Sequence, residues 1–266
     1  MVLRVGTSGY SYPEWVEAGF YPAGMNSARM LRHYAATFST VELNYTWYQM
    51  PKADAIERQR RQAPEGFLFA AKLTRTLTHE VEEHWREQAR RYREGVAPLL
   101  QAMQLAAVLV QLPGEFGRTK TNRAYLSGLL EELAGLPLAV EFRHASWAHE
   151  RVFEELARRR VALAAVDEPA LPGLFPRLER VTNPEFFYVR FHGRNRDGWR
   201  SGNLQNKFDY SYADAELREW IARCLDPMAR AAQAGLVFFN NHVRAQAAKN
   251  ASTLLRLLRE HGLEAR

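Results

Sequence analysis

The feature that most constrains the fold is a regular alternation of strand-like and helix-like segments along the chain. Short runs rich in apolar residues recur, and nearly all are followed by a segment whose apolar residues have helical spacing. The expected strands lie at residues 3–9, 40–48, 66–73, 106–112, 138–143, 161–167, 186–192 and 236–241. Eight such units predict parallel strands joined by helical crossovers.

The segments between the strands divide into helices and long loops. We expect helices at residues 26–38, 51–62, 78–103, 119–133, 149–159, 213–232 and 245–261. The long one at 78–103 should break near Gly95 or Pro98. Residues 10–25 after the first strand and 193–212 after the seventh form long connections. Loops of this length are often functional.

The length of 266 residues suits one α/β domain, a (β/α)8 TIM barrel spanning residues 1–266. No shift of composition and no low-complexity linker divides the chain. A doubly wound open sheet is the structural alternative. It lacks support because Gly6-Thr7-Ser8-Gly9 does not match the glycine fingerprint of dinucleotide-binding folds.

The fifth strand predicts a polar barrel interior. Val140 and Phe142 alternate with Glu141 and Arg143, so the charged pair should point inward if the apolar pair faces the helices. Buried charges need partners or a solvated cavity. The same alternation predicts an inward polar set near the carboxyl ends of the strands, where barrel enzymes place their active sites. This set comprises Ser8, Glu42, Asn44, Lys72, Gln111, Glu141, Arg143, Asp167, Arg190 and His192, with Asn240, Asn241 and His242 from the eighth strand.

Four members of this set are candidate catalytic residues: Glu141, Lys72, Asp167 and His192. His192 has the parity of Arg190 and an imidazole that titrates near neutrality, which suits a general acid or base. Glu141 or Asp167 is the alternative base. Lys72 is expected to stabilise developing charge or to pair with Glu141.

A second group is expected to bind substrate: Glu42, Asn44, Arg143, Arg190, Arg194, Asn240 and Asn241. Arginines offer forked donors to phosphate or carboxylate. Arg190 and Arg194 flank the start of the loop after the seventh strand, a frequent phosphate site in barrels. The alternatives are a purely structural polar network and a solvated basic loop.

The formal net charge of +6 and the pI near 9.5 favour an anionic ligand, either a phosphate-bearing small molecule or a nucleic acid. Much of this charge lies in arginine runs on expected helix surfaces, such as Arg58, Arg60 and Arg61, which are typical of solvated faces. No cofactor is expected. A divalent metal is a weaker alternative, because no paired-histidine spacing occurs and the inward cations would repel it.

The single cysteine, Cys224, falls in a helical apolar pattern and is expected to be a buried structural thiol. One cysteine excludes an internal disulfide and fits a reducing compartment. We find no signal-peptide pattern and no apolar run of about 18 residues. The expected location is therefore the cytoplasm, with no membrane partner.

Several motifs carry a resemblance to a known family. They are Gly6-Thr7-Ser8-Gly9-Tyr10, Thr40-Val41-Glu42-Leu43-Asn44, Phe69-Ala70-Ala71-Lys72, Gln111-Leu112-Pro113, Val140-Glu141-Phe142-Arg143-His144, Tyr188-Val189-Arg190-Phe191-His192-Gly193-Arg194 and Phe239-Asn240-Asn241-His242. In this order they resemble domain-of-unknown-function family 72, the YecE-like family. The resemblance implies a TIM barrel and supplies no established reaction, so no catalytic residues carry over.

The expected function is therefore an enzyme acting on an anionic, phosphate-bearing substrate at the barrel mouth by acid–base chemistry. The sequence does not separate a hydrolase from a lyase or an isomerase. One alternative is a nucleic-acid-binding protein, suggested by the fold-level similarity of such barrels to endonuclease IV. Another is a small-molecule-binding barrel without turnover.

Overall fold

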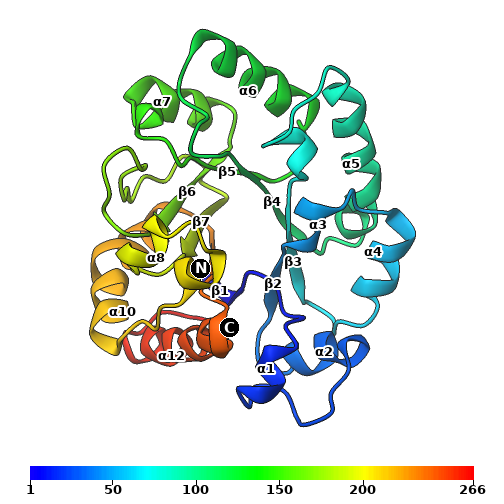
Figure 1. Cartoon of the computed structure of the whole chain (residues 1–266), viewed down its shortest axis with the longest axis vertical. Coiled ribbons are helices and arrows are strands. Elements are labelled where there is room, and N and C mark those ends of the chain that lie inside the picture. The colour runs from blue at the N-terminus through cyan, green and yellow to red at the C-terminus, as the bar shows by residue number, and fades with distance from the viewer.

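Eight parallel strands form the barrel, and the sequence order is kept around it (Figure 1). The computed structural model describes residues 1–266 apart from the side chain of Leu204. The sheet order is β1-β8-β7-β6-β5-β4-β3-β2. The strands are β1 (Val2–Thr7), β2 (Thr40–Leu43), β3 (Leu68–Lys72), β4 (Leu105–Gln111), β5 (Leu138–Glu141), β6 (Ala162–Asp167), β7 (Phe186–Phe191) and β8 (Ala234–Phe239). The predicted (β/α)8 TIM barrel is confirmed.

The barrel closes between β1 and β2. There the ladder is reduced to one bridge between Ser8 and Glu42, beside which the Gly9 amide donates to the Glu42 carbonyl at 2.8 Å. Tyr34 from the helix behind supplements it: its hydroxyl accepts from the Thr7 amide at 2.8 Å and donates to the Thr40 carbonyl at 3.1 Å. A side chain thus ties together two strands whose backbones share few direct bonds.

Helices surround the barrel in chain order, from α2 through α4, α5, α6, α7 and α10 to α12 (Figure 1). The α-helices are α1 (Glu14–Glu17), α2 (Ser27–Tyr34), α3 (Tyr45–Tyr48), α4 (Ala53–Arg60), α5 (Trp85–Gln101), α6 (Lys120–Glu132), α7 (Glu150–Arg158), α8 (Arg196–Arg200), α9 (Leu204–Phe208), α10 (Asp214–Trp220), α11 (Asp226–Ala231) and α12 (Gln246–Glu260). Short 3-10 turns are η1 (Arg75–Leu77), η2 (Ala145–Trp147) and η4 (Val243–Ala245), and η3 (Ile221–Leu225) is a π-helical turn.

Three sequence predictions of elements need correction. The second strand ends at Leu43, because residues 45–48 turn into α3 rather than continuing the strand. The helix expected from residue 78 begins only at Trp85 and then runs unbroken past Gly95 and Pro98. The helix expected at 213–232 is divided by the π-helical turn η3 into α10 and α11. The long loop after β7 contains the short helices α8 and α9.

The interior of the barrel is filled by small residues facing large ones. Strands β3 to β6 contribute mainly alanines, whereas β7 and β8 contribute Phe186, Tyr188 and Phe238. These aromatic rings occupy the volume that the alanines leave, so the lower part of the barrel is packed rather than hollow. Charged side chains begin directly above this apolar layer.

Candidate functional site

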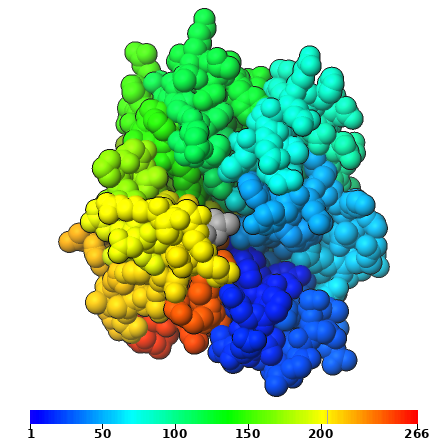
Figure 2. All heavy atoms as spheres, in the orientation of Figure 1, coloured from blue at the N-terminus to red at the C-terminus, as the bar shows by residue number. Residues whose placement is uncertain are grey.

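A pocket of about 850 Å³ lies above the carboxyl ends of the strands. The loops after β1 and β7 approach each other over it, dark blue and yellow at the centre of the face in Figure 2. Tyr12 from the first loop stacks on His242, with ring centroids 4.8 Å apart, and Phe208 from the second lies 5.9 Å from the same ring. The two loops predicted to be long therefore form the pocket rim together.

Below the pocket, Arg190 bridges two carboxylates from distant strands. Its Nη2 lies 2.7 Å from Glu42 Oε1, and its Nη1 lies 2.8 Å from Glu141 Oε2. The Tyr188 hydroxyl donates to the other oxygen of Glu42 at 2.6 Å. All these side chains are fully buried or nearly so. One buried guanidinium thus serves as the shared ion-pair partner of two buried carboxylates.

Arg143 extends this arrangement toward the pocket. Its Nη2 lies 2.7 Å from Glu141 Oε1, and its Nη1 binds Glu168. Desolvation alone would raise the pKa of Glu141, but Arg143 and Arg190 outweigh it and hold this pKa well below its usual value. Glu141 is therefore a fixed anion. We call Glu42, Glu141, Arg143, Glu168, Arg190 and His192 the buried ion network.

His192 belongs to this network and is completely buried. Its Nε2 lies 2.9 Å from Arg143 Nη2 and 3.5 Å from Arg190 Nη1. Desolvation and Arg143 lower its pKa well below the usual value, so the ring is neutral. The Asn240 amide nitrogen lies 3.1 Å from Nδ1 and donates to it, which leaves the ring proton on Nε2, 3.2 Å from the acceptor Glu141 Oε1.

The eleven predicted site residues fall into three groups. Five line the pocket: Asn44, Lys72, Arg143, Arg190 and Asn240. Three are fully buried in the ion network, among them two of the catalytic candidates: Glu42, Glu141 and His192. Three lie on the helix side of the sheet: Asp167, Arg194 and Asn241.

The inward orientation predicted for Asp167 is wrong. Its carboxylate accepts from Arg194 at 2.8 and 2.7 Å, from the Tyr212 hydroxyl at 2.7 Å and from the Trp220 indole, all behind the sheet. Strand β6 is apolar along its whole length before Asp167, so no alternation marks its inner face. The next residue, Glu168, takes the inward position and binds Arg143.

Arg194 and Asn241 are likewise not placed to touch a ligand in the pocket. Arg194 is occupied by Asp167 and by Glu216, at 2.9 Å. Asn241 donates to the Tyr210 carbonyl at 2.7 Å and to Asn250 Oδ1 at 2.9 Å. Both side chains fix the loop after β7 against the helices. Of the two adjacent asparagines, only Asn240 faces the pocket, as the period of a strand requires.

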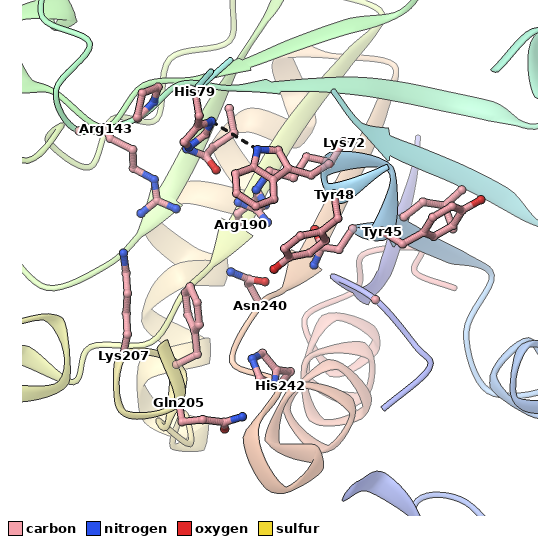
Figure 3. Close-up of a pocket in the computed structure, with 18 of the residues that line it drawn as sticks. Tyr45, Tyr48, Lys72, His79, Arg143, Arg190, Gln205, Lys207, Asn240 and His242 are labelled. Atoms are coloured by element: carbon pink, nitrogen blue, oxygen red, sulfur yellow. Dashed lines mark hydrogen bonds between the residues drawn. The ribbon is translucent and has the colours of Figure 1, made fainter. Parts of the chain in front are cut away.

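Lys207, which the sequence did not single out, completes one side of the pocket wall. Lys207 of α9 lies with its Nζ 3.9 Å from the centroid of the Trp199 ring, and Arg143 Cζ lies 5.4 Å from the same ring. Figure 3 shows Lys207 and Arg143 pointing toward each other across one side of the pocket. We call Arg143 and Lys207 the cation pair. The sequence shows only that Lys207 is basic, since its contact with Trp199 forms when the loop folds and Arg143 comes from the segment after β5.

Neither pocket lysine has a carboxylate partner among the described residues: no carboxylate oxygen lies within 4.0 Å of Lys72 Nζ or Lys207 Nζ. Burial, and to a smaller extent the positive charge of Arg190, lowers the pKa of Lys72 to about 7. Desolvation and Arg143 lower the pKa of Lys207 to about 8. Glu168 is shifted the other way, since burial raises its pKa to about 7. Three groups around one pocket therefore titrate near neutrality.

The described residues contain no cluster of three His, Cys, Asp or Glu side chains able to hold a metal ion. Carboxylates that could serve as ligands, such as Glu42 and Glu141, are bonded to arginine instead. Within the same described part of the chain, no helix is both long enough and apolar enough to cross a lipid bilayer.

Eight parallel strands with a charged pocket above their carboxyl ends define a protein of the TIM-barrel class. Comparison with protein families is consistent with this geometry. The family described as "Protein of unknown function DUF72" matches residues 4–265, and the chain belongs to it. The resemblance found in the strand motifs is thereby confirmed.

Relatives match along 64% to 97% of the chain. The UPF0759 protein YunF of Bacillus subtilis is 30% identical over 97% of this chain and 95% of its own length. The UPF0759 protein YecE of Escherichia coli O157:H7 is 27% identical over 64% of this chain and 59% of its own. A crystal structure of a DUF72 family protein from Thermotoga maritima superposes with a TM-score of 0.88, at 33% identity, covering 97% of this chain and 100% of that one.

Proposed function

We propose that the pocket binds a small organic anion, bearing a phosphate or carboxylate beside a planar part, and that the protein is an enzyme acting on it by acid–base chemistry. The observation that carries this proposal is the cation pair. Arg143 and Lys207 point into the same space and contact the same indole ring, Trp199. Arg143 is paired with Glu141 and Glu168, whereas Lys207 has no carboxylate partner within 4.0 Å in the part of the chain that the structure describes, and an anion between the two cations accepts a charge-assisted hydrogen bond from each.

The pocket wall also suits the rest of such a ligand. Trp47, Trp199, Tyr48 and Phe208 all line it, and Tyr48 is 60% exposed at the rim. Aromatic rings of this kind stack on planar groups and bury apolar surface while leaving polar edges wet. Asn44 and Asn240 supply neutral hydrogen-bonding groups to the same space. The ligand class is therefore an anion with an unsaturated or ring-shaped body.

Among the four catalytic candidates, Lys72 is the one that lines the pocket and titrates near neutrality. Glu141 is held as an anion by two arginines, and His192 is buried beneath them. We assign these two a positioning role, since they hold Arg143 and Arg190 in place. Of the four candidates, this leaves Lys72 to act on the ligand itself. Hydrolase, lyase and isomerase chemistry are all compatible with this arrangement.

Calorimetric titration tests the anion proposal with inorganic phosphate, phenyl phosphate and benzoate as probes. We expect phenyl phosphate to bind more tightly than inorganic phosphate. Lys207→Met should weaken its binding by about tenfold, as loss of one charge-assisted bond implies. Lys249→Met is the matched control, because Lys249 is exposed on α12 and its replacement removes the same charge far from the pocket. Equal affinity of both variants for every probe would reject the proposal.

Nucleic acid is the second candidate partner, and the net charge is its basis. Several helix-surface arginines are paired with carboxylates on the same helix: Arg58 with Asp54 at 2.9 Å, and Arg158 with Glu155 at 2.6 Å. These runs therefore add little free positive charge. Binding of duplex and single-stranded DNA across a salt series tests this candidate, since phosphate contacts require affinity to fall steeply with salt.

A further inference from the structure

Lysine is rare in this chain, and its placement is informative. Only five of the 36 lysine and arginine residues are lysines: Lys52, Lys72, Lys120, Lys207 and Lys249. Two of these five line the pocket. Arginine stays protonated in proteins, whereas lysine can lose its proton and present a lone pair. The pocket therefore contains the kind of basic residue that can act as a nucleophile.

Lys72 is held rigidly where it enters the pocket. Its carbonyl at the end of β3 accepts from the Thr46 hydroxyl at 2.6 Å and from the Tyr92 hydroxyl at 3.2 Å. Its Nζ lies 4.9 Å from the centroid of the Trp47 ring, and that indole in turn donates to His79 Nδ1 at 3.3 Å (Figure 3). The two hydrogen bonds therefore fix the Lys72 backbone, and the Trp47 ring positions its amine.

The surroundings of Lys72 favour a neutral amine. The carboxylates that could have paired with it, Glu42 and Glu141, are already bonded to Arg190, and Arg190 adds a positive charge nearby. Desolvation together with this charge lowers the pKa of Lys72 to about 7. At neutral pH an unprotonated amine facing the pocket is therefore accessible to Lys72, as it is not to an ordinary surface lysine. A lysine desolvated beside another cation is a known form of activated nucleophile.

We propose that Lys72 is a nucleophile that forms a Schiff base with a carbonyl group of the ligand. This inference rests on the proposed anion site, with the cation pair holding the anionic end of the ligand while Lys72 faces its carbonyl carbon. The substrate class is then an oxo acid or a phosphorylated aldehyde or ketone. Lys207 contacts Trp199 and belongs to the anion end of the pocket.

The step balances without any oxidant or reductant. The Nζ lone pair forms a bond to the carbonyl carbon, the π pair moves to oxygen, and a proton passes from nitrogen to that oxygen. A second proton, from solvent at the open rim, lets the hydroxyl leave as water while the nitrogen lone pair forms the C=N bond. Carbonyl compound, neutral amine and one proton from solvent thus give a protonated imine and water, and that proton supplies the positive charge of the imine.

Reductive trapping tests the inference on the full-length protein. The protein is incubated at pH 7 with 4-formylbenzoate, or with uncharged benzaldehyde, in the presence of cyanoborohydride, and labelled lysines are mapped by peptide mass spectrometry. We expect Lys72 to be labelled at least about tenfold faster than the exposed Lys249, because its amine is desolvated beside the Arg190 cation inside the pocket. Lys72→Arg should keep the charge and lose this adduct. Mapping separates it from adducts of the N-terminal amine.

The two aldehydes distinguish failure of the nucleophile from failure of the anion site. If both proposals hold, 4-formylbenzoate labels Lys72 faster than benzaldehyde does, and Lys207→Met lowers that ratio about tenfold. Fast labelling of Lys72 by both aldehydes without any anion preference would support the nucleophile and overturn the anion site. Labelling of Lys72 no faster than that of Lys249 with both aldehydes would overturn the nucleophile.

Discussion

Arg190 shows how single residues organise this protein. It lies on β7, and its guanidinium bonds carboxylates from β2 and β5 across the barrel. Such an arrangement is costly to desolvate and contributes little net stability compared with apolar packing. What it does provide is a fixed geometry: Glu141, held by Arg190, in turn orients Arg143 toward the pocket.

Removal of Arg190 should therefore be severe. Arg190→Met leaves Glu42 and Glu141 buried without their main partner, and we expect a loss of about 3–5 kcal/mol in the free energy of unfolding. Urea denaturation measures this loss. Arg58→Met is the matched control, since Arg58 is 69% exposed in its pair with Asp54 and should cost no more than about 0.5 kcal/mol. Equal effects of the two variants would contradict the role of the network.

Acid should weaken the protein through Glu141. Its pKa in the folded state lies well below the usual value, so its stabilising contribution is complete above the unfolded-state pKa of about 4.3 and is lost as the pH falls toward the folded-state value. Glu141→Gln should lower stability at pH 7 and flatten the dependence of unfolding free energy on pH below about 4.5. An unchanged acid slope in this variant would show that Glu141 is not held as an anion.

The sequence predicts these residues unevenly, for a physical reason. Where polar and apolar residues alternate, as at Glu141 and Arg143, the alternation alone assigns the inner face of the strand. In β6 every residue before Asp167 is apolar, so the pattern does not mark the inner face and does not identify Glu168. The role of Lys207 in the pocket is not predictable from the sequence, because Trp199 and Arg143 become its neighbours only in the folded protein.

Helix α5 shows a similar limit among the helices. The sequence predicts a break near Gly95 or Pro98, yet the helix is continuous, and Gly95 packs against the backbone of Pro51 before α4. A Cβ at Gly95 would lie 2.3 Å from the Pro51 carbonyl oxygen. Helix propensity is a property of the local sequence, whereas this contact depends on how α4 and α5 pack.

Two glycine substitutions separate the effect of helix propensity from the effect of packing. Gly95→Ala should lower the free energy of unfolding by about 1–3 kcal/mol despite alanine's better propensity, because the methyl group overlaps backbone. Gly128→Ala in α6 meets only side-chain atoms, the edge of the Trp85 ring at 3.3 Å and Arg86 Nη2 at 3.7 Å, and should be neutral or stabilising by up to about 1 kcal/mol. Thermal unfolding compares the two, and a stabilising Gly95→Ala would refute the packing explanation.

Across the protein as a whole, the barrel supplies a rigid base and the loops supply many of the ligand-facing groups. The barrel, its strand order and its two long loops are predictable from strand–helix alternation and loop length. The sequence does not predict that the two long loops meet over the pocket. Contacts such as those of Tyr12 and Phe208 with His242 join segments that are far apart in the chain. The pocket is thus a property of the closed barrel rather than of any one motif.

The most direct test of the anion site is a crystal structure of the protein with phenyl phosphate. We expect phosphate oxygens within hydrogen-bond distance of both the Arg143 guanidinium and the Lys207 ammonium, with the phenyl ring against the aromatic wall of the pocket. A phosphate bound elsewhere, with Arg143 and Lys207 contacting no part of the ligand, would contradict the proposed site.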